Sequence, residues 1–143
     1  MDLYHARVLE LAADIDHVGR LAEPHGSATR VSRVCGSTVT IDVRLDGDRI
    51  TDIGIEAQAC ALGQAAAAVL TANAVGATVA EVRAARDGLS AMLREGASPP
   101  TGRFWELRHL EGVRDYPPRH ASTLLAFDAA VAAIDAANTP ATA

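Results

Sequence analysis

Cys35 and Cys60 are the residues of this 143-residue chain whose side chains are best suited to chemistry. Cys35 opens a Cys-Gly-Ser turn, and Cys60 directly precedes an alanine-rich segment with high helix propensity. Thiolates that converge from two loops can bind a soft metal such as zinc or iron. The free N–H groups at the start of a helix would also stabilise a thiolate at Cys60. The alternative is that one or both cysteines are small buried hydrophobic residues, because a spacing of this length is not itself a metal motif.

The segment between the two cysteines predicts a β-hairpin that would bring them together. Residues 38–45 alternate between polar and apolar side chains, the period of a half-buried strand. The Asp46-Gly47 pair then predicts a tight turn, and residues 49–56 return as the partner strand. Because a hairpin holds its two open ends side by side, we expect Cys35 and Cys60 to lie at one edge of the sheet.

The flanking segments predict helices around this hairpin. Thr78 and Glu81 have the spacing of a capping box at the start of a helix. The further expected elements are a helix over 3–21, a first strand over 28–34 with Val31 and Val34 in the core, and helices over 61–74 and 122–136. This order predicts an α+β domain, a small antiparallel sheet of about three strands with helices packed on one face. We expect one domain over residues 1–137 and a disordered tail over 138–143.

Composition limits the class of partner. The formal net charge is -5 and the sequence has no basic cluster, which argues against nucleic-acid binding. The apolar stretch over 57–82 is interrupted by polar residues and glycines, so we expect a buried helix there and no membrane partner. The first residues lack the basic and apolar regions of a signal peptide, which predicts a cytoplasmic protein. Cysteines there are expected to be free, metal-bound or reactive.

Three short motifs around the hairpin carry a family resemblance. They are Val34-Cys35-Gly36-Ser37-Thr38-Val39, then Glu56-Ala57-Gln58-Ala59-Cys60-Ala61-Leu62, and finally Tyr116-Pro117-Pro118-Arg119-His120-Ala121-Ser122-Thr123-Leu124-Leu125. In this order the chain resembles the U-type iron–sulfur cluster assembly scaffolds, the family of NifU-like N-terminal domains, IscU and SufU. The resemblance extends over about residues 3–134. It implies the SufE/NifU-like fold and a scaffold or carrier that is not an enzyme.

The resemblance also implies the site residues, and here the chain departs from the family. The family's third cysteine falls on Ser122, and the aspartate that follows Cys-Gly in the family is Ser37. A serine hydroxyl is a far poorer ligand than a thiolate, because it stays protonated near neutral pH. By resemblance, Cys35, Cys60 and Ser122 would hold a [2Fe–2S] cluster. His120 could replace the missing sulfur, so the expected ligands of iron or zinc are Cys35, Cys60 and His120.

Three functions are compatible with these residues. The first is a scaffold that works with a cysteine desulfurase and recipient apo-proteins, with a homodimer as one route to four ligands. The second is a zinc-dependent sulfur-transfer protein in which Cys60 accepts a persulfide. The third is a relative that has lost the site and acts as a protein-interaction or regulatory module. We rank the scaffold first.

The remaining candidates are expected to be structural. Phe104 and Trp105 would anchor the connection after the Pro99-Pro100 loop, with a partner-docking patch as the alternative. The scattered histidines have no metal-binding spacing and are expected to be solvated or locally bonded: His5, His17, His25 and His109.

Overall fold

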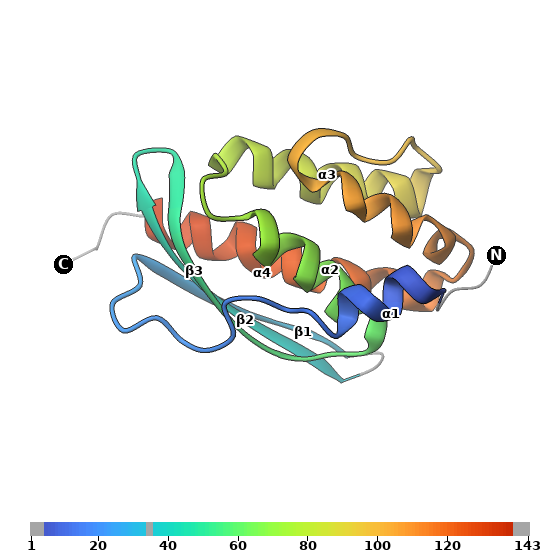
Figure 1. The fold of residues 1–143 in the computed structure, drawn as a ribbon, viewed down its shortest axis with the longest axis horizontal. Coiled ribbons are helices and arrows are strands. Elements are labelled where there is room, and N and C mark those ends of the chain that lie inside the picture. The colour runs from blue at the N-terminus through green and yellow to red at the C-terminus, as the bar shows by residue number, and fades with distance from the viewer. Residues whose placement is uncertain (1–4, 34–35, 139–143) are drawn as a thin grey trace.

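A three-stranded antiparallel sheet lies beneath a layer of helices in the computed structural model, which describes residues 5–33 and 36–138 (Figure 1). The strands are β1 (Gly26–Ser32), β2 (Ser37–Asp46) and β3 (Arg49–Gln58), in the order β1-β2-β3. The helices are α1 (Ala6–Ala12), α2 (Ala61–Asn73), α3 (Val79–Glu95) and α4 (His120–Asn138), with 3₁₀ helices η1 (Gly102–Asp115) and η2 (Pro117–Arg119). The predicted α+β class is confirmed. Residues 139–143 of the expected tail lie outside the described residues, and Asn138 belongs to α4.

Strand β2 supplies the centre of the core, as its alternation predicts. Val39, Ile41 and Val43 are fully buried against the helices. The helices above them are rich in alanine, and small side chains let α2 and α4 pack closely on each other and on the sheet. Helix α4 is long and apolar enough to cross a membrane together with η2, but 67% of its most apolar window is buried inside the domain. Its apolarity is accounted for by the core.

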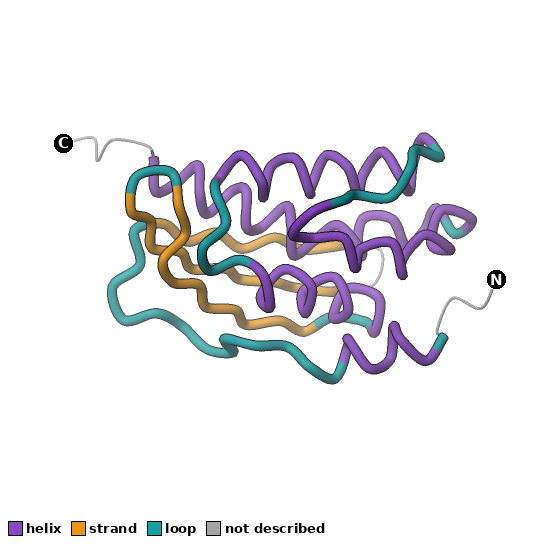
Figure 2. The backbone as a smooth tube through the Cα atoms, turned by 45° about the horizontal axis from the view of Figure 1, so that its top comes forward, coloured by secondary structure: helices purple, strands orange, loops and turns teal. Residues whose placement is uncertain are grey.

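The predicted first helix is wrong in its length, because the chain leaves the helix after Ala12. From there the chain runs along the open edge of β3 and across the face of the sheet away from α3 and α4 (Figure 2). Val18 forms a parallel bridge with Ile55, where Gly19 N donates to Ile55 O at 2.7 Å. Residues 13–25 therefore cover part of the sheet face that the alternation of β2 assigns to solvent.

Asp42 is buried beneath this covering segment. Its Oδ2 accepts hydrogen bonds from Arg20 Nε at 2.7 Å and from Leu21 N at 3.0 Å. Its Oδ1 accepts from Arg20 Nη2 at 3.0 Å and from Ser27 Oγ at 2.5 Å. Burial by itself would raise the pKa of Asp42, but these hydrogen bonds and the Arg20 charge lower that pKa below its ordinary value. Asp42 thus holds the covering segment to β2 as a carboxylate.

Strand β1 begins two residues earlier than predicted and lies against the end of α4. A Cβ atom at Gly26 would lie 2.1 Å from Ala133 O and 2.6 Å from Ala137 N, so the backbone of β1 touches the backbone of the last helix. The prediction that Val31 is a core residue is wrong, since it is 57% exposed on the edge strand. Val34 lies outside the described residues.

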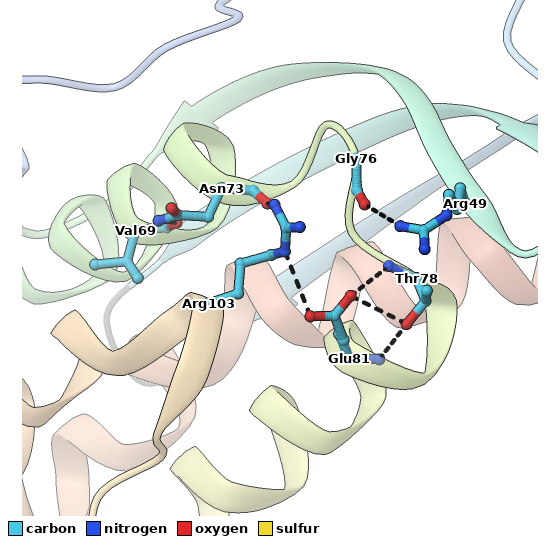
Figure 3. A network of polar contacts seen from close by, with 7 residues as sticks. All are labelled: Arg49, Val69, Asn73, Gly76, Thr78, Glu81 and Arg103. Carbon is cyan, nitrogen blue, oxygen red and sulfur yellow. Dashed lines mark hydrogen bonds and ion pairs between the residues drawn. The ribbon is translucent and has the colours of Figure 1, made fainter.

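A network of polar contacts joins α2, α3, η1 and the start of β3 (Figure 3). The predicted capping box is present: Glu81 N donates to Thr78 Oγ1 at 3.1 Å, and Thr78 N donates to Glu81 Oε1 at 2.9 Å. Arg103 donates to Glu81 Oε2 and to Asn73 O, and Arg49 donates to Gly76 O. We call Arg49, Asn73, Gly76, Thr78, Glu81 and Arg103 the junction.

Candidate functional site

Cys60 stands at the N-cap of α2, half-buried, directly after the end of β3. Its backbone is extended, with φ -67° and ψ 169°, and Gln64 N donates to Cys60 O at 2.9 Å to begin the helix. Within the described part of the chain its thiol makes no capping hydrogen bond. The sulfur is therefore carried by a fixed backbone without being committed to the helix terminus.

Strand β1 ends and β2 begins at the same end of the sheet as Cys60, and Cys35 lies between these two strands in sequence. Ser32 pairs with Ser37, and Thr38 pairs with Gln58, two residues before Cys60. Gly36 follows with a φ of +69° and donates its N–H to Ser32 O at 2.8 Å. Cys35 itself lies outside the described residues. The approach of its sulfur to Cys60 stays a prediction, and the pairing of its neighbours is what favours it.

Ser122, in the first turn of α4, does lie beside Cys60. Cys60 Sγ donates to Ser122 Oγ at 3.9 Å, and that hydroxyl in turn donates to Arg119 O at 3.2 Å. Ser122 is fully buried. The position that corresponds to the family's third cysteine therefore faces the second cysteine, as the motifs predict, but it presents a hydroxyl that is already bonded within its own helix turn.

His120 is oriented toward η1. Its Nε2 lies 3.0 Å from Val113 O and 3.1 Å from Arg114 O, and the residue is 8% exposed. A ring nitrogen next to two carbonyl oxygens carries a proton and donates, which leaves it unable to bind a metal ion. A metal ligand at His120 would need the other ring nitrogen or a rotated side chain, so this role also stays a prediction.

The described residues offer few donors for a metal ion. Over residues 5–33 and 36–138 there is no group of three or more His, Cys, Asp or Glu side chains that could hold one. Cys60 is the one described residue of the predicted ligand set with a soft, uncommitted donor atom. Iron and zinc in proteins usually take four ligands. A site built on Cys60 and the predicted ligand Cys35 would therefore need further ligands.

Two features of this region are not evident from the motifs. Gly63, in the first turn of α2, lies against Ser122 O, where an added Cβ would be 3.0 Å away. The buried acid at Asp42 supports β2, and strand alternation alone places it toward solvent. A glycine three residues after Cys60, inside an otherwise strongly helix-forming segment, is the signal that could have revealed the first feature. The second has no local signal.

The two aromatic residues after the Pro99-Pro100 loop differ in burial. Phe104 is buried with its ring edge-to-face against Phe127, at 5.6 Å between centroids, which confirms the anchoring role for that residue. Trp105 is 46% exposed, with the Arg108 guanidinium 5.2 Å from its ring centre. His5 Nε2 bonds to His109 O at 2.9 Å, a contact that joins the N-cap of α1 to η1 across 104 residues of sequence.

Comparison with known proteins gives consistent matches. The family model described as the NifU-like N terminal domain matches residues 3–100. The iron–sulfur cluster assembly scaffold protein IscU of Streptococcus pyogenes serotype M1 is 29% identical over 132 residues, which cover 88% of this chain and 82% of that protein.

Solved structures agree with these matches. The crystal structure of a nitrogen-fixing NifU-like protein (N-terminal) from Brucella abortus superposes with a TM-score of 0.95 at 46% identity, covering 97% of this chain and 96% of that one. A putative iron–sulfur cluster assembly scaffold protein for the SUF system from Fervidobacterium islandicum AW-1 shares the fold, with a TM-score of 0.81 at 23% identity over 89% and 93% of the two chains.

Proposed function

Because the chain belongs to the family of NifU-like N-terminal domains, we propose that it is an iron–sulfur cluster assembly scaffold whose cargo is carried by the thiols of Cys35 and Cys60. The cargo would be a nascent [2Fe–2S] cluster or an iron ion, with zinc as an alternative occupant. The chain would perform no turnover on a small substrate. A cysteine desulfurase would supply sulfur, and cytoplasmic apo-proteins would receive the product.

The observation that supports this proposal best is the position of Cys60. Its thiol is half-buried at the start of α2, beside the first turn of α4 and at the end of the sheet where β1 ends and β2 begins. A thiol in this position is reachable, near free helix N–H groups, and carried on rigid elements. These are the properties that a soft-metal ligand needs.

The short donor set determines the kind of binding that we propose. A scaffold must release what it assembles, and two thiols hold a cluster less tightly than three or four. The remaining ligands would come from the cysteine desulfurase, from a small thiol or from a second copy of the chain. Ser122 would lie beside the cargo as a poor ligand, and His120 would contribute only after leaving its η1 carbonyls.

Anaerobic reconstitution with iron and sulfide tests the proposal. The wild type is expected to develop the visible absorption of a cluster, with iron and sulfide bound in proportion to protein. Cys60→Ala and Cys35→Ala should each lose most of this absorption while keeping the far-UV spectrum of the fold. Ser122→Ala is the matched control, since it alters the same pocket without removing a thiol, and it should retain cluster formation.

The result that would overturn the proposal is equally direct. A colourless product with an unchanged count of reactive thiols in the wild type would show that the two cysteines bind no cluster. Retention of the full absorption by both cysteine variants would show that the cluster is held elsewhere.

The bonding of His120 and Ser122 favours a second candidate function. Both side chains at the start of α4 are committed to carbonyl oxygens of neighbouring turns, as in a domain that has lost its metal site. Such a chain would act as a protein-interaction or regulatory module. Metal analysis of protein purified without added metal discriminates between the two: stoichiometric iron or zinc supports the scaffold, and a metal-free protein that also fails reconstitution supports the module.

A further inference from the structure

Helix α2 approaches the start of α4 closely at Gly63, which lies against Ser122 O. Gly63 is buried in the first turn of α2. An ideal Cβ at this position would lie 3.0 Å from Ser122 O and 3.1 Å from the Cβ of Ala59. Both distances are shorter than ordinary contacts between a Cβ and another heavy atom, so a side chain here would push at least one of these neighbours away.

These two neighbours, Ala59 and Ser122, belong to the two segments that form the candidate site. Ala59 immediately precedes Cys60, and Ser122 is the residue that receives the hydrogen bond from Cys60 Sγ at 3.9 Å. Glycine lowers the stability of a helix interior relative to alanine. The positions around it in α2, such as Ala65, Ala66 and Ala67, are buried alanines. Helix propensity therefore gives no reason for a glycine at 63, whereas the approach of α4 does.

We propose that Gly63 is a positioning residue for the candidate site: by having no side chain, it sets the separation between the Cys60 thiol and the first turn of α4. The functional importance of Gly63 rests on the proposed function, because the thiol that Gly63 positions is the one that we assign to the cargo. The separation between this thiol and α4 does not depend on that function and can be measured without any metal.

Disulfide trapping measures that separation. In a Cys35→Ser background, Ser122→Cys introduces one thiol opposite Cys60, and diamide removes the two thiol hydrogens to join the sulfurs. The observed 3.9 Å between Sγ and Oγ predicts rapid formation of an intramolecular disulfide, seen as a loss of two hydrogens by mass spectrometry and of two reactive thiols. Adding Gly63→Ala should slow this reaction about tenfold, because small misplacements of reacting groups have large effects on rate.

Gly88→Ala is the matched control. Gly88 lies in α3, where an added Cβ would be 3.2 Å from Pro100 Cγ, so the substitution makes a similar intrusion at a helix surface remote from Cys60. It should change thermal stability about as much as Gly63→Ala and leave the trapping rate at its original value. Ala59→Gly added to Gly63→Ala removes one of the two close contacts and should restore part of the rate.

The outcomes are distinguishable. An unchanged trapping rate in Gly63→Ala, or an equal slowing in Gly88→Ala, overturns the positioning role. Where Gly63→Ala alone does not fold, the comparison is made with the Ala59→Gly pair, and an unslowed rate there overturns it too. Slow trapping in Gly63→Ala together with a wild type that binds no cluster would keep the positioning role and reject the proposed function.

Discussion

Asp42 in the middle of β2 is fully buried and Cys60 at the start of α2 is half-buried, and the hydrogen bonds of the two side chains differ in number and length. The carboxylate of Asp42 is fully buried and accepts four hydrogen bonds of 2.5 to 3.0 Å, two of them from the charged Arg20. Over residues 5–33 and 36–138, the thiol of Cys60 has one hydrogen-bond partner, a neutral hydroxyl at 3.9 Å. The carboxylate is therefore held by several short bonds, and the thiol by one long bond to a described residue.

The Asp42 carboxylate stabilises the fold, whereas the Cys60 thiol can exchange its contact for a ligand. Charge-assisted hydrogen bonds to a buried acid are strong, and their loss leaves donors without partners. A long contact between a thiol and a hydroxyl is weak and costs little to exchange. We therefore expect substitutions at Asp42 and at the junction to lower the free energy of unfolding without changing the reactivity of the Cys60 thiol. Substitutions beside Cys60 should change the reactivity of the thiol with little effect on stability.

The largest expected effect is that of Asp42→Ala. It removes the acceptor that ties residues 20 and 21 to β2 and leaves Leu21 N and Ser27 Oγ without their partner. We expect a loss of about 3 kcal/mol in the free energy of unfolding, measured by urea denaturation. Disulfide trapping between Cys60 and Ser122→Cys should proceed at its usual rate.

Asp52→Ala is the control for this substitution. Asp52 also lies on the sheet and pairs with an arginine, Arg44, at 3.8 Å, but its side chain is 56% exposed. Its removal should leave stability within about 0.5 kcal/mol of the wild type. Equal destabilisation by the two substitutions would contradict the importance of burial at Asp42.

Acid should reproduce part of the same loss. The pKa of Asp42 is lowered because hydrogen bonds from Arg20, Ser27 and Leu21 outweigh its burial, and that of Glu81 is lowered chiefly by the hydrogen bond from Thr78 N. A folded-state pKa below the unfolded one means that the unfolded chain takes up protons first as the pH falls. The stabilisation is complete above about pH 5 and declines below it, toward the folded pKa values. The urea midpoint of the wild type should fall as the pH is lowered through this range. In the double variant Asp42→Asn with Glu81→Gln, the midpoint should depend less on pH.

Glu81→Ala should have a smaller effect. It removes the acceptor of Thr78 N and the partner of Arg103 at the junction, at 2.9 and 3.4 Å. Loss of half of a capping box predicts a destabilisation of about 1 kcal/mol, measured by thermal unfolding. Cluster reconstitution should be unaffected. A loss of cluster in this variant with the fold intact would mean that the junction and the site are coupled.

Ser122→Ala should have the smallest effect on stability, below about 1 kcal/mol, and a selective effect on Cys60. It removes the acceptor of the Cys60 S–H, so alkylation of this thiol in a Cys35→Ser background should speed up about threefold. Thr123→Val is the matched control, because Thr123 Oγ1 also donates to Arg119 O, at 2.8 Å. Equal alkylation rates in the two variants would show that Ser122 does not restrain the thiol.

Local patterns predict the parts of this fold that depend on neighbours in sequence. The capping box of Thr78 and Glu81, the hairpin around the Asp46-Gly47 turn and the buried face of β2 are all confirmed, because each follows from the spacing of adjacent residues. The position of Ser122 beside Cys60 is the one that the family resemblance implies.

Features that depend on distant segments could not be predicted in this way. Alternation assigns Asp42 to the outer face of the sheet, and only the path of residues 13–25 determines that this face is covered. The helix predicted as far as Leu21 ends at Ala12, and residues 13–25 instead cover the sheet, with His17 at a φ of +59°. The orientation of the His120 ring depends on Val113 O in η1, a 3₁₀ helix that the sequence pattern does not predict.

The contact of Gly26 with Ala133 and Ala137 has a consequence for how the chain is made. The first strand of the sheet packs against the closing turns of the last helix, more than a hundred residues later. As the polypeptide leaves the ribosome, β1 can pair with β2 early. The apolar face of these two strands is not covered until α4 has emerged. A chain whose translation stops before Ala133 would leave part of this apolar face exposed, a target for chaperones and proteases.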